Sequence, residues 1–173
     1  EEFTYHPTEE RVLIKDVFNS SGEVQETTLY IRDNFVRVIN RTGTYDSVYV
    51  KIDGQLVAQK NPDGSKYFVH NDHLGSASVI TDEQGNAIEN SSYSPFGEIL
   101  SGGSKSRFSY SGQEFDSVLG DFDYHARRYA AWGQFITPDN ELPDKYDPQQ
   151  LNRYSYVENN PYNQEAKKSH QGF

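Results

Sequence analysis

Short runs of β-branched and aromatic residues alternate with clusters of Gly, Asn and Asp over the first half of the chain. The runs are five to eight residues long and occupy positions 11–18, 27–31, 35–39, 47–52, 55–59, 66–70 and 76–80. Val, Ile, Tyr, Phe and Thr favour strands, whereas Gly, Asn and Asp favour turns. No helical period competes over this region. The pattern therefore predicts strands that are joined by short turns.

The turns recur at a fixed spacing. Four sequences of the form Asn/Asp-x-x-Gly end at glycines 21 residues apart (43−22, 64−43 and 85−64), namely Gly22, Gly43, Gly64 and Gly85. Turn residues also fall halfway through the unit, at Gly54 and Gly75. Asn or Asp at the first turn position bonds nearby backbone, and Gly at the fourth accepts a left-handed conformation. A constant period is typical of a repeat architecture, here with two strands in each unit.

We therefore expect an all-β fold, in which antiparallel meandering hairpin repeats of about 21 residues form a β-strip or shell segment. The core material must be aromatic, because hydrophobic residues are only 34% of the chain while Tyr and Phe number 13 and 10. The second half is expected to be an aromatic-rich core module with little helix, and Trp132 to anchor it. A single hairpin is marginal in water, so the repeats must stabilise one another.

Charge and composition exclude several classes of partner. The net charge of −10 disfavours nucleic acid and anionic membrane surfaces, which bind clustered Lys and Arg. No apolar run is long enough for a membrane span, and the lack of Cys excludes disulfides and thiolate chemistry. We expect no cofactor and no metal. The lack of any Met suggests a fragment or a processed chain. Glycosylation triplets begin at Asn19, Asn40 and Asn90, and they slightly favour an extracellular protein.

The stretch HNDHLGS, at 70–76, has the residue types of a catalytic or metal site. His70 and His73 are three positions apart, so on a strand they would point to opposite faces. A zinc site also needs a third protein ligand, and Ser76 lacks a nucleophile elbow. The stretch is interpreted as a tight corner that polar side chains hold, with metal binding as the alternative.

Charged residues are dense between positions 112 and 128. The acidic run at 112–123 is interpreted as a solvated turn between strands. Arg127 and Arg128 follow among aromatic and acidic residues. We expect each arginine to pair with a local carboxylate and to stack on an aromatic ring.

Five short motifs follow one another from position 67 onward: DHLGS, Y-x-PFGE, Y-x-GQE-x-D, ARRY and NNP. They lie in the segments 67–100, 107–129 and 133–161, which resemble the repeat-associated core module of the Rhs (YD-repeat) family. The upstream repeats resemble the YD repeats that precede this module. The residues that carry the core motif are His70, Asp72, His73, Gly75, Ser76, Pro95, Phe96, Gly97, Gly112, Gln113, Glu114, Asp116, Arg127, Tyr129, Asn159, Asn160 and Pro161.

The resemblance implies a β-strip that winds into a hollow shell, which in bacterial secreted proteins encloses a C-terminal toxin. It also implies secretion or a place at the cell surface. We expect three parts: YD-like β-hairpin repeats at 1–100, the core module at 101–161 and a C-terminal tail at 162–173. The implied partners are the remaining repeats of a longer parent chain or other copies of this one, with a toxin as cargo.

Many members of the family cut their own chain after the NNP motif, with aspartates in two Asp-Pro-x-Gly motifs. The first aspartate matches Asp139, but Asn140 follows it in place of Pro. The second motif is absent, and Glu165 could replace its aspartate only if the geometry of the loop shifted. Chemistry by an aspartate pair needs two carboxyl groups that share a site. Asp139 is therefore the one catalytic candidate, and self-cleavage is an alternative to a structural role.

The function that we expect is that of a non-enzymatic structural segment. Two further alternatives stay open. Copies could build an extracellular fibre by strand addition, with residues 1–7 as the donated strand. A carbohydrate-binding surface could also form if the sheet presented a row of aromatic rings. The tyrosines that would make such a row are Tyr30, Tyr45, Tyr49, Tyr67 and Tyr93.

Overall fold

The computed structural model describes residues 1–7, 11–125, 127–140, 146 and 148–162. The chain divides into two compact units. The first unit contains residues 1–69 and 81–88, and the second contains the rest. The domain boundaries predicted from the motifs mark sequence modules and not compact units, and they stay predictions.

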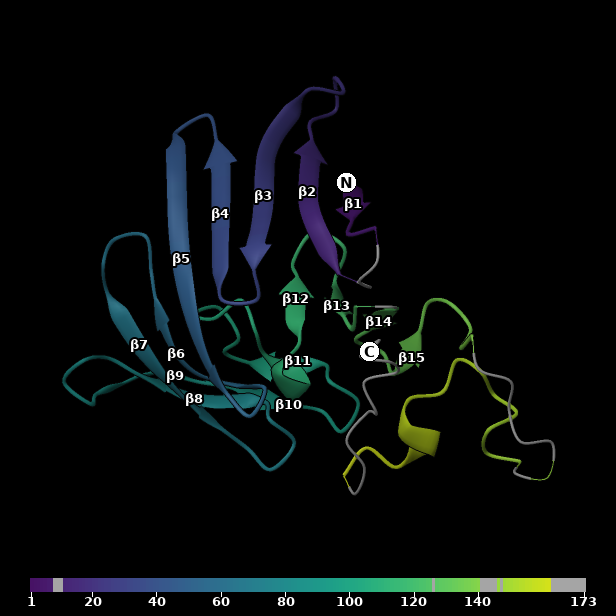
Figure 1. Cartoon of the computed structure of the whole chain (residues 1–173). Helices are drawn as coiled ribbons and strands as arrows, with labels where there is room; N and C mark the ends of the chain where they lie inside the picture. Colours follow the sequence, from purple (N-terminus) through teal and green to yellow (C-terminus); the bar gives the residue numbers. More distant parts are fainter. Residues whose placement is uncertain (8–10, 126, 141–145, 147, 163–173) are drawn as a thin grey trace. The chain divides into compact units, whose positions relative to one another are not determined.

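Antiparallel strands that follow the chain order make up the largest sheet (Figure 1). Among the described residues this sheet has nine strands in the order β1 to β9. Their bounds are Glu2–Tyr5 (β1), Val12–Phe18 (β2), Val24–Arg32 (β3), Phe35–Asn40 (β4), Gly43–Ile52 (β5), Gln55–Lys60 (β6), Lys66–Asn71 (β7), Ala77–Thr81 (β8) and Ala87–Asn90 (β9). Every run of β-branched and aromatic residues that predicted a strand coincides with one of them, although the runs at 11–18 and 76–80 begin one residue before the strand. The predicted all-β meander is confirmed.

Between residues 19 and 98, five turns share one hydrogen-bond pattern. Their first and fourth residues are Asn19 and Gly22, Asn61 and Gly64, Asp72 and Gly75, Asp82 and Gly85, and Ser94 and Gly97. The glycine N–H donates to the carbonyl of the first residue at 2.9–3.1 Å, and the first residue's N–H donates to the carbonyl after the glycine at 2.8–3.0 Å. The glycines have φ of 78–95°. This left-handed backbone favours glycine because it strains an L side chain.

Two of the predicted turn glycines have a different geometry. The β4–β5 hairpin has a two-residue loop, so Gly43 is the first residue of β5 and pairs with Asn40. Its φ of 152° is far from the left-handed turn values. Gly54 follows Asp53, and both residues have positive φ (79° and 50°), as a two-residue type I′ hairpin turn requires. A constant glycine spacing therefore accommodates more than one kind of turn.

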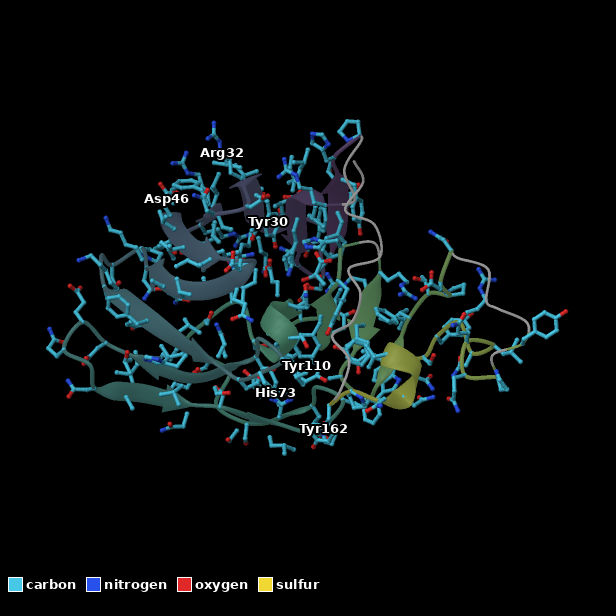
Figure 2. All side chains as sticks on the ribbon, turned by 60° about the horizontal axis from the view of Figure 1, so that its bottom comes forward. Tyr30, Arg32, Asp46, His73, Tyr110 and Tyr162 are labelled. Atoms are coloured by element: carbon cyan, nitrogen blue, oxygen red, sulfur yellow. The ribbon has the colours of Figure 1, made fainter. Side chains whose placement is uncertain are left out.

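The sheet of the first unit has one buried face and one partly exposed face around β3 to β5. Thr28, Val36 and Tyr49 share the buried face, because cross-strand partners and alternate residues point the same way. On the other face Arg37 lies opposite Asp46, with Nε 2.7 Å from Oδ1 and Nη2 2.8 Å from Oδ2 (Figure 2 labels Asp46). The hydrogen bond from Arg37 lowers the pKa of Asp46.

The segment 1–7 is not an unpaired arm. Strand β1 lies antiparallel to β2, with Phe3 opposite Lys15 and Thr4 opposite Ile14. The fibre alternative would donate this segment to another copy, yet here it is a strand in the sheet of its own chain. Among the described residues, β1 is an edge of the sheet, since β2 is its neighbour in the strand order.

The second unit has shorter elements. They are β10 (Ser92–Tyr93), β11 (Ile99–Ser101), β12 (Glu114–Asp116), β13 (Asp121–Asp123), β14 (Arg128–Ala130), β15 (Gln134–Phe135) and two 3-10 turns, Tyr110–Gly112 and Val157–Asn159. Strands β10 and β11 pair with each other, and β12 to β15 form a four-stranded antiparallel sheet. The small amount of helix that was predicted is confirmed.

One expectation for the second unit is wrong. Trp132 is not a core anchor, because 78% of its surface is exposed. It lies in the turn between β14 and β15, where the N–H of Gly133 donates to the carbonyl of Ala130 at 3.0 Å. The indole at this turn position faces water, while smaller phenol and benzyl rings fill the interior.

Candidate functional site: the aromatic core module

The four-stranded sheet has an aromatic face. Phe115, Phe122, Tyr129 and Phe135 lie opposite one another on β12, β13, β14 and β15. Neighbouring ring centroids along this row are 5.0, 6.3 and 5.3 Å apart, in tilted or edge-to-face geometry. Aromatic pairs in this geometry stabilise the fold beyond the area that they bury. The row is therefore the base of the core.

Two tyrosines from outside the sheet complete the core. Tyr110 and Tyr156 are almost fully buried, and their ring centroids are 6.2 Å apart. The Tyr156 hydroxyl accepts a hydrogen bond from the Tyr124 hydroxyl at 3.0 Å and lies 3.2 Å from the Ser111 hydroxyl. Burial raises the pKa of Tyr110 and Tyr124, because the phenolate form is poorly solvated there. The phenols therefore act as neutral hydrogen-bonding groups.

The PFG motif holds two of these tyrosines by its backbone. The Pro95 carbonyl accepts from the Tyr110 hydroxyl at 2.7 Å, and the Phe96 carbonyl accepts from the Tyr129 hydroxyl at 2.7 Å. A Cβ at Gly97, where φ is 95°, would lie 2.7 Å from Cδ1 of Tyr110. The glycine is therefore needed for both its backbone conformation and the close ring.

The HNDHLGS stretch is a hydrogen-bonded corner of the second unit. Asp72 Oδ1 accepts from the backbone N–H groups of Leu74 at 2.9 Å and Ser76 at 2.8 Å. His70 and His73 are both exposed, and His73 Nε2 lies 3.3 Å from the Tyr162 carbonyl oxygen. Among the described residues, no three His, Asp or Glu side chains gather as metal ligands.

The DHLGS and GQE motifs meet at Ser76, which is fully buried. Its hydroxyl accepts from the backbone N–H of Ser111 at 3.1 Å, and the N–H of Ala77 donates to the Ser109 carbonyl at 3.1 Å. A Cβ at Gly112 would lie 3.4 Å from the Gly75 carbonyl oxygen. Two motifs that are separated by about 35 residues are thus joined through backbone contacts.

The acidic face of the same sheet is not solvated, contrary to the interpretation of the run at 112–123. Asp116 and Asp121 are only 5% and 4% exposed. Arg128 Nη2 contacts Asp121 Oδ1 and lies 3.3 Å from Asp116 Oδ2, while Nη1 lies 3.9 Å from Asp123 Oδ2. Arg107 pairs with Glu114 at 2.7 Å. Desolvation by burial raises the pKa of Asp123.

Asp139, the catalytic candidate, contacts two arginines. Its Oδ2 lies 2.9 Å from Arg127 Nη2, and its carbonyl accepts from Arg153 Nε at 2.8 Å. The guanidinium of Arg127 lies 3.7 Å from the centroid of the Phe135 ring, as stacking on an aromatic ring requires. Glu165, which would supply the second carboxyl group, lies outside the described residues. Self-cleavage through Asp139 stays an untested alternative to the structural role.

The remaining motif residues lie beside the core. Gln113 Nε2 donates to the Ser111 carbonyl at 3.3 Å. In the NNP motif, Asn159 Nδ2 donates to Gln149 Oε1 at 3.3 Å, the Asn160 N–H donates to the Val157 carbonyl at 2.9 Å, and Pro161 is buried. The predicted tail at 162–173 lies outside the described residues, Tyr162 excepted.

Two other sets of predicted residues have separate places. Asn19 and Asn40 use their side-chain oxygens to hold turns, by accepting from Ser21 N–H at 2.9 Å and Thr42 N–H at 2.9 Å. Asn90, at the end of β9, is exposed. Their glycosylation stays a prediction. Of the tyrosine row, Tyr49 is buried and Tyr93 donates its hydroxyl to the Ala77 carbonyl at 2.8 Å, so neither ring joins an exposed row.

Sequence reasoning missed Tyr110, Tyr124 and Tyr156 as the centre of the module. The signal was present in the high tyrosine content. However, the composition does not show which tyrosine rings are buried, because the contacts of these rings join segments that are 32–46 residues apart.

Comparisons with known proteins give consistent results. The Teneurin YD-shell family matches residues 6–162. The chain is similar to Salivary gland surface protein 1 of Aedes aegypti, with 30% identity over 182 residues, which cover 94% of this chain and 5% of that protein. It is also similar to Teneurin-1 of Gallus gallus, with 27% identity over 125 residues, which cover 66% of this chain and 4% of that protein.

Solved structures share the fold. The crystal structure of TcdB2-TccC3 matches with a TM-score of 0.64 and 20% identity, over 88% of this chain and 10% of that chain. The Photorhabdus luminescens Tc holotoxin pore matches with a TM-score of 0.62 and 20% identity. The match covers 87% of this chain and 10% of that chain. The chain therefore spans about a tenth or less of the length of each of these proteins.

Proposed function

Because the chain belongs to the Teneurin YD-shell family, as its YD-repeat motifs indicated, we propose that it works as a wall segment of a longer β-shell. Its function is structural. The observation that carries the proposal is the strand order β1 to β9, in which each strand has its sequence neighbours beside it. A sheet of this kind grows by adding strands at its ends, since its interior needs no crossover.

The edge strand supports a continuation of the wall. Among the described residues β1 is the first strand in the order and has β2 as its neighbour, and the edge of a sheet is where a further strand can be added. The chain spans only 5% and 4% of its curated relatives, so a long parent polypeptide would supply such strands. We assign the edge to preceding repeats of the parent chain.

The cargo and the location follow as parts of the same proposal. Solved structures of the same fold include a Tc holotoxin pore and a TcdB2-TccC3 complex. On this basis the shell of the parent protein would enclose a C-terminal polypeptide, and that cargo would be a toxin. A salivary gland surface protein among the relatives supports secretion or display at a cell surface. Among the described residues, no helix has the length and apolar character to cross a bilayer.

Hydrogen–deuterium exchange of the β1 amides tests the wall proposal. The amides of Glu2–Tyr5 should exchange at least tenfold faster in the 173-residue chain than in the parent polypeptide, where a further strand would cover the edge. Strand β5, which has β4 and β6 on its two sides, is the internal control and should be protected in both. Equal exchange of β1 in both proteins would contradict the proposal.

Light scattering separates the wall from the fibre alternative. A wall segment that lacks its parent chain should elute as a discrete monomer near 19.8 kDa. A ladder of larger species, abolished by Phe3→Pro in β1, would favour strand addition between copies, because proline removes a donor on the side away from β2.

A further inference from the structure

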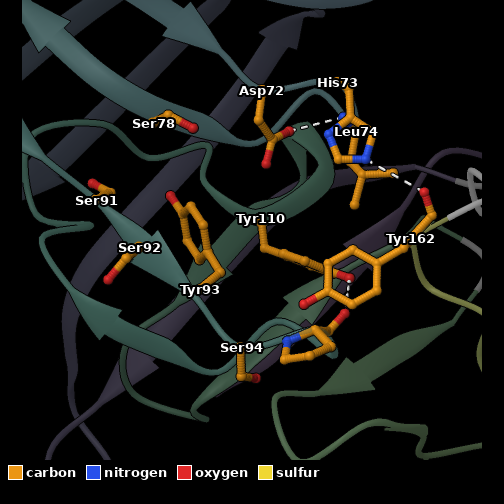
Figure 3. A pocket seen from close by; sticks show the side chains of 11 residues that line it. Asp72, His73, Leu74, Ser78, Ser91, Ser92, Tyr93, Ser94, Tyr110 and Tyr162 are labelled. Atoms are coloured by element: carbon orange, nitrogen blue, oxygen red, sulfur yellow. Dashed lines mark hydrogen bonds between the residues drawn. The ribbon is translucent and has the colours of Figure 1, made fainter.

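A small cavity lies within the second unit, between the corner at 72–74 and the 92–95 segment (Figure 3). Its volume is about 170 Å³. Cavities that hold drug-sized ligands are larger, about 300–1,000 Å³, so this one is suited to a small group. The described residues that line it include no Lys or Arg.

Three tyrosines form the walls of this cavity: Tyr93, Tyr110 and Tyr162. The ring centroids of Tyr93 and Tyr110 are 5.9 Å apart, and the rings are inclined by 54°. Their hydroxyls are already engaged, by the carbonyls of Ala77 and Pro95 at 2.8 and 2.7 Å. Tyr110 is almost fully buried, so ring surface for a ligand comes mainly from Tyr93, which is partly buried, and from Tyr162, which is exposed.

The Asp72 carboxylate supplies negative charge at the same cavity. Its Oδ1 accepts the two backbone hydrogen bonds of the corner, and Figure 3 shows the carboxylate above the tyrosine rings. Burial raises the pKa of Tyr93 to about 12, with smaller contributions from the charges of Glu89 and Asp72. Burial also raises the pKa of Tyr110, and the charge of Asp72 makes a small contribution in the same direction.

We propose that this cavity binds the head group of a small organic ammonium cation. Tyrosine rings attract a cation by their electron-rich faces, and a nearby carboxylate adds an ion pair. The net charge of −10 also favours the approach of cations. His73 lies at the rim, beside Tyr162, and the serine hydroxyls that line the cavity are neutral. The site is independent of the wall function.

Choline titration of the ¹⁵N-labelled chain tests the site. We expect saturable shifts of the amide signals of residues 72–74 and 91–94, with a dissociation constant in the millimolar range. The uncharged carbon isostere of choline, dimethylbutanol, should bind at least tenfold more weakly. Tetramethylammonium and methylammonium, compared at equal concentration, report whether the head group is quaternary or primary, and saturable binding of either supports the proposal.

Two turn variants provide a matched pair. Asp72→Asn removes the charge but keeps the turn, because Asn19 and Asn61 hold the same turn type. It should weaken choline binding at least tenfold. Asp82→Asn changes the same position of an equivalent turn and the net charge by the same amount, and it should leave binding unchanged.

Tyr162→Ala serves as a second variant, since it removes an exposed ring without opening the buried core. It should weaken binding severalfold. The proposal is overturned if choline and dimethylbutanol bind equally, or if the variants at 72 and 82 bind choline alike. Shifts that never saturate, or that occur outside the cavity residues, would overturn it as well.

Discussion

The two units use strands in opposite ways. In the first unit the strands reach ten residues, and large apolar side chains such as Ile31, Ile39 and Ile52 stay exposed. In the second unit the strands β10 to β15 have two or three residues, yet five aromatic side chains are almost fully buried. Long hydrogen-bonded strands thus make a wall that needs neighbours, whereas short strands suffice where a ring cluster supplies the stability.

The largest expected effect tests the ring cluster. Phe122→Ala should lower the free energy of unfolding of the second unit by about 3–5 kcal/mol, because it empties the centre of the aromatic row. Phe68→Ala should lower the free energy of unfolding of the first unit by only about 1 kcal/mol, since Phe68 is 43% exposed. Pulse-labelled hydrogen exchange along a urea titration measures each unit separately. Equal losses would remove the distinction between the units.

The next effect compares two ionic contacts. Arg128→Met leaves the buried carboxylates of Asp116 and Asp121 without their shared arginine, and should destabilise the second unit by about 3 kcal/mol. Arg37→Met breaks an ion pair whose partners are both about 40% exposed, and the same urea titration should show little change. A large loss in Arg37→Met would mean that the wall depends on its surface charges.

A third pair compares two glycines with similar backbone. Gly97 and Gly85 have φ of 95° and 82°. The Cβ of an alanine at Gly85 would meet nothing within 4 Å, so the substitution should lower the free energy of unfolding by about 1–2 kcal/mol through backbone strain alone. At Gly97 the added Cβ also meets the Tyr110 ring, so the loss should be about 1–3 kcal/mol larger. Urea midpoints of the two variants give the difference, and identical midpoints would refute the close contact.

The smallest effect is a difference in pH dependence. Asp123 has a raised pKa, so the folded chain binds more protons than the unfolded chain above pH 3.8, and the free energy of unfolding falls as pH rises through this window. Asp46 has a lowered pKa, so its contribution to the free energy of unfolding increases as the pH rises towards 3.8. Asp123→Asn should abolish the fall in the free energy of unfolding, and Asp46→Asn should abolish the rise. Urea titrations between pH 3 and pH 6 measure this free energy, and a change in the opposite direction in either variant would contradict the prediction.

The wall could be predicted from the sequence because its signal is local. Strands such as β3 and β5 follow directly from runs of Val, Ile, Tyr and Thr, and a turn such as Asp82 to Gly85 is decided by two residues three positions apart. Gly43 shows the limit of this reasoning, because the glycine spacing does not reveal which register the hairpin adopts.

The core module was predicted as aromatic, but its arrangement was not. Trp132 is exposed and Tyr156 buried, although composition alone favours the larger ring as an anchor. Burial of Asp116 depends on Arg128, which joins it from another strand. Such choices are made by contacts between distant segments, and a single sequence does not specify them. The family motifs identified the residues at these contacts without indicating what each one touches.

The position of Trp132 has a practical consequence for spectroscopy. Since the chain's one indole already stands in water, its fluorescence maximum will move little when the protein melts. The phenols of the second unit, in contrast, are locked in an asymmetric array, so near-ultraviolet circular dichroism is the optical signal that will vanish with their packing.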